Sequence, residues 1–223
     1  RLIYLQNDNS PKLLNATNQE VEFIDALSGG VEITIPFSSS LNDFIVSDSS
    51  DSSKDVLLLA RNDNQLEKWG ISDYSSTLIE SQDVNCQRVI EINVDADNSK
   101  EIICLGRKNS ANKTPLIIFN DGDNGLQRVS DSYIPGQVTE VATYTDHNGK
   151  ERLIASLARY VDRYSLDIES SVLAEIDPFT GSVIWESLPL TSQLNPRHFF
   201  EHSIPEKRRI LFSTAREVFL IEQ

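Results

Sequence analysis

The sequence predicts an all-β protein made of consecutive β-propeller blades, each a four-stranded antiparallel sheet. Three observations lead to this prediction: an eight-residue string that recurs along the chain, strand-like segments on both sides of each copy, and no helical apolar period of useful length. The arginines that close the copies, Arg61, Arg107, Arg159 and Arg216, follow one another at intervals of 46, 52 and 57 residues. These intervals are close to the ~40–50-residue periods of propeller repeats.

The recurring string predicts one buried strand in each blade. Its copies at 54–61, 100–107, 152–159 and 209–216 each begin with Lys or Arg, continue with mostly apolar residues and end with a small residue followed by Arg. A near-continuous apolar run is typical of a strand buried on both faces. We label the strands of a blade A to D from the central channel outward and assign the string to strand B. A partial copy at residues 1–4 predicts that the chain opens on a B strand and that the first blade lacks strand A.

The segments around the string predict the other strands in order. A strands are expected at 44–46, 89–94, 138–144 and 198–204, and C and D strands include the pairs 116–119 with 126–129 and 171–176 with 182–186. The chain is expected to close on a C strand at 217–221, so that the last blade lacks strand D. The blades then span roughly 1–37, 42–82, 86–131, 137–190 and 196–223 of a single propeller domain or propeller fragment. Because both end blades lack a strand, a slice of a larger ring is favoured over an irregular five-blade ring closed by the two termini.

Composition restricts the classes of partner. The net charge of −14 repels phosphate backbones and anionic membranes, so neither is expected as a partner. No apolar run approaches the ~18–20 residues of a transmembrane segment. The sequence begins at Arg1 inside an apolar stretch and contains no Met, so any targeting segment is expected upstream. Cys86 and Cys104 are too few for a disulfide framework or a zinc site; they are either a bridged pair or separate, with Cys104 as a small buried hydrophobic residue.

One segment points to a known repeat. Residues 175–185 read Glu-Ile-Asp-Pro-Phe-Thr-Gly-Ser-Val-Ile-Trp, which resembles the repeat of quinoprotein-type (PQQ-like) propellers, Ala-x-Asp-x-x-Thr-Gly-x-x-x-Trp, across the turn between strands C and D. Asp177 and Thr180 are suited to hydrogen-bond the backbone of a tight turn, and Gly181 to supply a positive φ. Trp185 is expected to pack between neighbouring blades. Glu175 stands where the family has Ala.

A second, less complete copy lies near the start of the chain. Residues 23–33 contain Asp25, Ser28 and Gly29 at the same spacing, with Ile33 in place of the Trp. The resemblance extends over most of the chain in the regular spacing of the predicted blades, but the motifs themselves are confined to a few blades. It implies a periplasmic or extracellular location.

The loops between strands A and B resemble a different family. Residues 94–102 are similar to the Asp-x-Asp-x-Asp-Gly loop of FG-GAP/VCBS-type propellers, where carboxylates bind calcium. Asp95, Asp97 and Glu101 are therefore the candidate calcium ligands, although the third Asp and the Gly of that loop are missing. Looser counterparts occur at Asp48, Asp51 and Asp55, and at Asp146 with Asn148. The alternative is a solvated hairpin whose acidic residues keep the loop soluble.

The closing arginines are candidates for partner binding. Arg61, Arg107, Arg159 and Arg216 occupy equivalent positions at the ends of successive B strands, so rotational repetition predicts an arc of arginines that could contact an anionic or acidic partner. In the alternative, each arginine pairs with a carboxylate of the adjoining blade and stabilises the ring.

Two further motifs carry little functional weight. Residues 198–202, His-Phe-Phe-Glu-His, match the H-x-x-E-H pattern of zinc proteases, but on a strand the two His side chains would lie ~13 Å apart with the Glu on the opposite face. The pattern is interpreted as a chance match. The N-glycosylation sequons at Asn15 and Asn112 are short enough to occur by chance.

The leading functional interpretation is a non-catalytic propeller that serves as a binding or scaffolding module of an extracytoplasmic, bacterial protein, with a protein or glycan partner. No catalytic residues and no cofactor are predicted. Two alternatives remain: a PQQ-dependent oxidoreductase propeller, and a calcium-stabilised adhesion or ligand-binding propeller of the FG-GAP/VCBS type. Fold alone does not decide among them.

Overall fold

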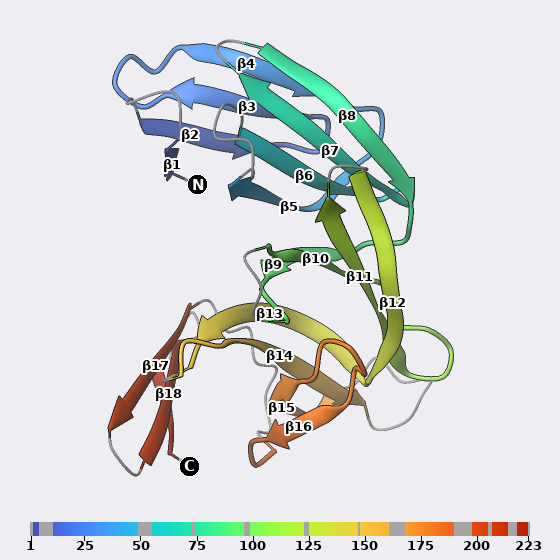
Figure 1. Ribbon diagram of the computed structural model, residues 1–223, viewed down its shortest axis with the longest axis vertical. Helices are drawn as coiled ribbons and strands as arrows, with labels where there is room; N and C mark the ends of the chain where they lie inside the picture. Colours follow the sequence, from blue (N-terminus) through green and yellow to red (C-terminus); the bar gives the residue numbers. More distant parts are fainter. Residues whose placement is uncertain are drawn as a thin grey trace. The chain divides into compact units, whose positions relative to one another are not determined.

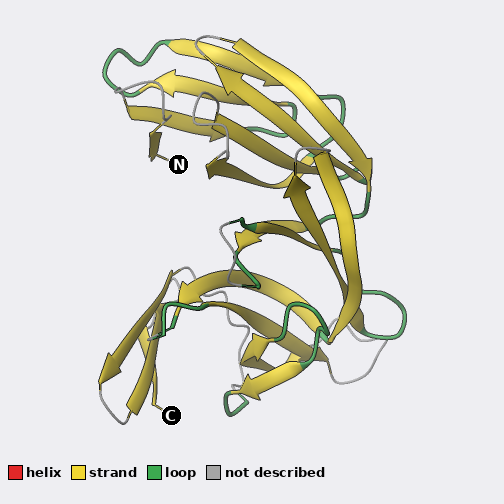
Figure 2. Cartoon of the chain, in the orientation of Figure 1, coloured by secondary structure: helices red, strands yellow, loops and turns green. Residues whose placement is uncertain are grey.

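Every regular element that the structure describes is a β-strand (Figure 2). The structure is a computed structural model, and it describes residues 2–4, 11–48, 55–72, 75–95, 99–122, 125–146, 148–160, 168–189, 198–204, 207–213 and 218–222. The strands form four four-stranded sheets and one three-stranded sheet, and all strands that neighbour each other in a sheet are antiparallel and consecutive in sequence. The predicted all-β fold of four-stranded antiparallel blades is confirmed.

The chain divides into two compact units, residues 1–89 and 90–223. The first unit contains two sheets, which Figure 1 shows by label. One sheet consists of β1 (Leu2–Tyr4), β2 (Pro11–Ala16), β3 (Glu20–Asp25) and β4 (Val31–Pro36), and the other of β5 (Leu41–Asp48), β6 (Asp55–Arg61), β7 (Gln65–Ser72) and β8 (Ser75–Asp83). Their facing side chains form one hydrophobic core, with Phe23 and Ile35 from the first sheet and Leu57 and Leu59 from the second.

The second unit contains the remaining sheets. β9 (Arg88–Ile92), which begins at the boundary, pairs in order with β10 (Glu101–Leu105), β11 (Lys113–Gly122) and β12 (Gly125–Pro135). The next sheet consists of β13 (Gln137–Thr145), β14 (Glu151–Tyr160), β15 (Ile168–Ile176) and β16 (Val183–Glu186), and the last of β17 (His198–Ile204), β18 (Lys207–Ser213) and β19 (Val218–Glu222). Ile103 and Ile118 pack with Leu153, Leu157 and Val172 in a core shared by the sheets β9–β12 and β13–β16.

The recurring string forms the second strand of its sheet, as predicted. In β6 the six residues from Asp55 to Ala60 are all buried, and in β10 all five residues are buried. Burial on both faces explains why the string is apolar without alternation. The fourth strands differ because they have an open side, and every residue of β8 is exposed or only partly buried.

The prediction for the first blade was wrong. β1 pairs with β2, and β2 pairs with β3, so the opening segment takes the first place in a four-stranded sheet instead of the second. The true second strand, β2, begins with Pro11 and carries the polar Asn15, so its sequence does not match the apolar string. The last sheet has three strands in the described part of the chain, corresponding to A, B and C.

Two further features bear on the predictions from composition. Both cysteines, Cys86 and Cys104, are buried and disulfide-bonded. The described residues include no helix with the length and apolar character that crossing a membrane requires.

Candidate functional site

The turn between β15 and β16 forms one part of the candidate site. The Asp177 carboxylate oxygen Oδ1 accepts the backbone N–H groups of Phe179 (2.9 Å) and Thr180 (3.1 Å). Gly181 has a φ of +68° and donates its N–H to the Asp177 carbonyl at 2.8 Å. An aspartate at the start and a glycine in the left-handed conformation at the end close the turn, and Phe179 lies at its tip with 47% of its surface exposed.

The turn between β3 and β4 has the same construction. The Asp25 oxygen Oδ1 accepts the N–H groups of Leu27 and Ser28, and Gly29, with a φ of +72°, donates to the Asp25 carbonyl. The backbone N–H of Ser28, its hydroxyl and the ammonium of Lys12 lower the pKa of Asp25 to about 2. Leu27 occupies the tip position and is 82% exposed.

Trp185 lies on β16, half-buried, opposite Glu175 of β15. Its counterpart Ile33 on β4 is 6% exposed.

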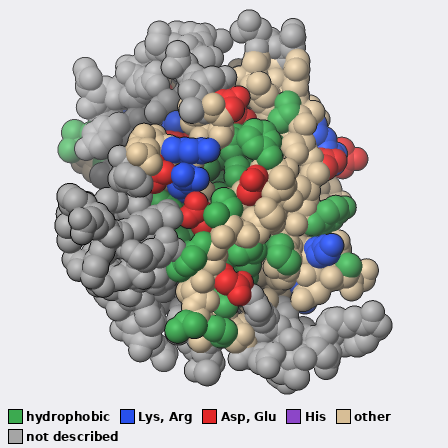
Figure 3. All heavy atoms as spheres, turned by 60° about the horizontal axis from the view of Figure 1, so that its bottom comes forward, with side chains coloured by type: hydrophobic (Ala, Val, Ile, Leu, Met, Phe, Trp, Pro, Cys, Tyr) green, Lys and Arg blue, Asp and Glu red, His purple; other side chains and the backbone are tan. Residues whose placement is uncertain are grey.

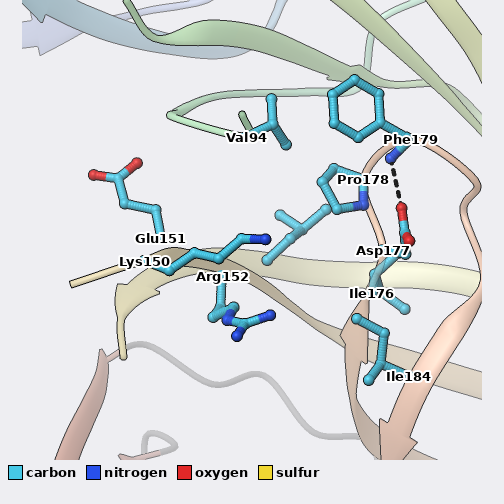
Figure 4. A pocket seen from close by; sticks show the side chains of 10 residues that line it. Val94, Lys150, Glu151, Arg152, Ile176, Asp177, Pro178, Phe179 and Ile184 are labelled. Carbon is cyan, nitrogen blue, oxygen red and sulfur yellow. Dashed lines mark hydrogen bonds between the residues drawn. The ribbon is translucent and has the colours of Figure 1, made fainter. Parts of the chain in front are cut away.

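A pocket of about 160 Å³ lies beside the β15–β16 turn (Figure 4). Its lining comes from the start of the β9–β10 loop, the start of β14 with the residue before it, the end of β15, the turn itself and β16. Val94, Pro178 and Phe179 form an apolar side, and the ammonium of Lys150 points toward Pro178. Glu151 and Asp177 supply carboxylates to the lining, whereas the guanidinium of Arg152 points away from the apolar side. Ile184, 56% exposed, extends the apolar surface at the edge.

A buried ionic network supports one wall of this pocket. The Arg152 guanidinium contacts Asp146 Oδ2 through Nε (2.9 Å) and Nη2 (2.8 Å), and its Nη1 is 3.6 Å from Glu175 Oε1. The Tyr144 hydroxyl donates to Glu175 Oε2 at 3.1 Å. Asp146 and Glu175 are 7% and 3% exposed, so Arg152 is held between two buried carboxyl groups.

The two carboxyl groups differ in acidity. Burial raises the pKa of Glu175, and the neighbouring Arg152 charge offsets this only in part. Burial also raises the pKa of Asp146, but the hydrogen bond from Arg152 and the N–H groups of Lys150 and Asn148 outweigh it, so that the pKa of Asp146 lies below its ordinary value. Of the two carboxyl groups, Asp146 is therefore the one that stays ionised to lower pH and forms the ion pair with Arg152.

The predicted arginines lie in different environments. The Arg61 guanidinium, 11% exposed, is paired with Glu67 and with Asp63 (2.6 Å), and it donates to Ser38 (3.1 Å) and Ser39 (3.0 Å) in the loop before β5. Arg107 is exposed after β10. The side chain of Arg159 and all of Arg216 lie outside the described residues. A role in partner binding stays a prediction.

The candidate calcium loop is only partly described. Asp97 lies outside the described residues, and Asp95 is exposed. Glu101 is 4% exposed, and its Oε2 accepts the N–H of Val94 at 2.8 Å. This carboxylate therefore fixes the backbone of the loop at Val94. Of the looser counterparts, Asp51 and the side chain of Asp48 also lie outside the described part. Within the described ranges no group of three or more His, Cys, Asp or Glu residues is placed to hold a metal ion, and calcium binding stays a prediction.

Sequence reasoning missed the ionic network. In the sequence, Glu175 stands out only as a departure from the Ala of the PQQ-like repeat. A glutamate at a position that is otherwise small and buried is itself a signal, because a buried carboxyl group needs a charged or hydrogen-bonding partner. Arg152, the first residue of its string, supplies that partner.

Surface charges are mixed on the face shown in Figure 3. In its coloured part, acidic and basic side chains lie among hydrophobic ones instead of forming separate areas. The pocket has the same mixed character.

Comparison with known proteins is informative at the level of fold. No family model matches the sequence, and no curated protein matches it. Hydrazine synthase of Kuenenia stuttgartiensis is similar in structure, with a TM-score of 0.61, 13% identity, and coverage of 95% of this chain and 54% of that one. BBS1N in complex with ARL6DN gives a TM-score of 0.60, 11% identity, and coverage of 100% and 60%. The chain thus spans less than two thirds of the length of either structure, and the similarity assigns it a β-propeller fold.

Proposed function

We propose that this chain is a non-catalytic β-propeller module that binds a protein or glycan partner and acts as a scaffold in an extracytoplasmic, bacterial protein. The observation that carries the proposal is the pocket beside the β15–β16 turn. It combines an exposed aromatic side chain, Phe179, with the exposed ammonium of Lys150. Concave sites with an apolar wall and a few polar groups are typical of ligand binding.

The rigidity of the surroundings favours binding. Asp177 fixes the backbone of the turn, and the Ser130 hydroxyl of β12 donates to the carbonyl of Phe179 at 3.3 Å. The Arg152 side chain is fixed by its hydrogen bond to the carboxylate of Asp146. A preformed site loses little conformational entropy when a ligand binds.

Two other observations support parts of the proposal. BBS1N, which is similar to this chain in fold, was crystallised in complex with ARL6DN, so a related fold presents a surface to a protein. The disulfide-bonded cysteines support an extracytoplasmic location, because disulfides persist mainly in oxidising compartments.

Photo-crosslinking tests the binding role. A benzophenone amino acid placed at position 179 in the host cell is expected to give a discrete adduct that mass spectrometry identifies, and Lys150→Glu should weaken binding of the purified partner. The same probe at Leu27, the tip of the equivalent turn in the first unit, is the matched control. No adduct, or identical adducts at both positions, would contradict the proposal.

The relationship to PQQ-like repeats is part of the proposal, and the two equivalent turns at Asp25 and Asp177 support it. Both alternatives to a plain binding module have direct tests. A shifted absorbance of added quinone would favour the oxidoreductase, and a melting temperature that rises with calcium and falls with chelator would favour the calcium-stabilised propeller.

A further inference from the structure

The size of the pocket limits its ligand to one ring-sized group. A cavity of about 150 Å³ is known to hold a molecule of the size of benzene, and this pocket measures about 160 Å³. Pockets for drug-sized ligands are larger, on the order of 300–1,000 Å³.

The polar groups of the pocket offer both donors and acceptors. Lys150 is exposed and brings three N–H donors. Glu151 uses Oε2 to accept the N–H of Asn93 (2.7 Å), and Asp177 uses Oδ1 in the turn. Within the described part of the chain, the second oxygen of each carboxylate is left for a ligand.

The first unit shows why Asp177 is available. Lys12 lies opposite Asp25 across β2 and β3, and its ammonium is 3.4 Å from Asp25 and 2.6 Å from Glu32. Arg152 holds the same place opposite Asp177, one step beyond the registered pair Leu153–Ile176. Asp146 and Glu175 draw Arg152 away, so the aspartate of this turn keeps an oxygen for the pocket.

Charges of both signs at the pocket favour a neutral ligand. The pocket offers the ammonium of Lys150 and the carboxylates of Glu151 and Asp177, whereas the charge of Arg152 is paired with Asp146. An anion would meet the two carboxylates, and a cation would meet the ammonium of Lys150. Hydroxyl groups donate and accept, so they satisfy both sets at once. The exposed ring of Phe179 can cover the apolar face of a ring that carries such hydroxyls.

We infer that this pocket binds one neutral sugar ring of a glycan, with the ring against Phe179, hydroxyls donating to Glu151 and Asp177, and a hydroxyl accepting from Lys150. This inference rests on the proposed binding function and names the class of ligand.

The assignment of a sugar ligand is tested by NMR titration of the ¹⁵N-labelled chain with methyl glycosides of glucose, mannose, galactose and N-acetylglucosamine. At least one glycoside is expected to shift the amides of Lys150, Phe179 and Thr180 saturably, with a Kd in the millimolar range. Phe179→Ala should weaken binding about tenfold, and Lys150→Met should also weaken it. Leu27→Ala, at the equivalent tip in the first unit, should leave the titration unchanged.

Two results would overturn the inference. One is that no glycoside gives saturable shifts, and the other is that Phe179→Ala binds as the unchanged chain does. If the glycosides fail but N-acetyl-phenylalaninamide shifts the same amides, the pocket takes a protein side chain. That outcome overturns the sugar assignment and leaves the proposed binding function standing.

Discussion

At the scale of single residues, Gly29 and Gly181 share a backbone conformation but differ in their surroundings. Both have a positive φ, +72° and +68°. A Cβ atom at Gly29 would meet no atom within 4 Å, whereas at Gly181 it would lie 2.7 Å from the carbonyl oxygen of Tyr133 in β12. Gly181 is therefore required both for the turn and for the close approach of the turn to the neighbouring sheet.

Alanine at the two glycines should separate these requirements. Gly29→Ala is expected to cost about 1–2 kcal/mol of unfolding free energy, which is the penalty for a left-handed residue with a side chain. Gly181→Ala should cost clearly more, because backbone atoms of Tyr133 have to move as well. Urea unfolding measures both, and equal losses would show that the contact with β12 contributes nothing.

Glu175 predicts a specific dependence of stability on pH. Burial raises its pKa above the ordinary 4.5, so the folded state keeps the proton to a higher pH than the unfolded chain does. The stability contributed by the neutral carboxyl is complete below pH 4.5 and is lost as the pH rises through the folded-state pKa.

Glu175→Gln removes this titration. Relative to the unchanged chain, the variant should become more stable as the pH rises from 4.5, while the amide oxygen can still accept the Tyr144 hydroxyl. Denaturant titrations across this pH range give the difference in unfolding free energy. A difference that stays constant, or that grows toward acid, would contradict the assigned direction.

At the scale of elements, Arg61 connects three segments of the first unit. From the end of β6 it contacts Glu67 on β7, Asp63 in the intervening turn, and Ser38 and Ser39 before β5. Arg128 forms a pair with Asp131 on β12 that is about half exposed on both sides. Substitutions at these two arginines therefore allow a comparison between a nearly buried ionic network and an exposed ion pair.

Arg61→Ala should destabilise the chain by about 2–4 kcal/mol, because it leaves the buried Glu67 without its cation. Arg128→Ala should cost only about 0–1 kcal/mol. Arg61→Lys is expected to fall between them, since an ammonium cannot reach all four partners at once. If Arg61→Ala is no more harmful than Arg128→Ala, the network does not stabilise the unit, and a docking role for Arg61 gains weight.

At the scale of the whole molecule, the disulfide constrains the unfolded chain. The cysteines at 86 and 104 enclose about 18 residues, and a loop of that length corresponds to about 3 kcal/mol in the chain-entropy account. Replacing both cysteines with serine should lower the melting temperature by roughly 6–12 °C for a chain of this size. A melting temperature that is the same with and without reductant would show that the bridge contributes nothing.

The sequence predicts the strands that are buried on both faces in several sheets, because they share an apolar pattern. It does not predict features that depend on a single contact between side chains. The strings that became β6, β10 and β14 are recognisable because both faces of these strands are buried, which removes polar residues from them. β2 escaped recognition because Pro11 and Asn15 interrupt its apolar pattern.

The site could be predicted only in part. The two turns follow from an aspartate, a hydroxyl residue and a glycine at fixed spacing, which is local chemistry. The pocket and the network of Arg152, Asp146 and Glu175 depend on which side chains meet across β14 and β15, and no local pattern specifies that. The same register places Arg152 opposite Asp177, and only the packing shows that it turns to other partners.

Cross-strand proton contacts measured by NMR test the central claim, that the recurring string is the second strand of successive antiparallel sheets. The account predicts contacts between Val46 and Leu57 and between Val141 and Ala155, because Leu57 and Ala155 hold the same place in their strings. Sequential amide contacts of a helix at either string, or strand partners that differ in register between the two copies, would contradict it.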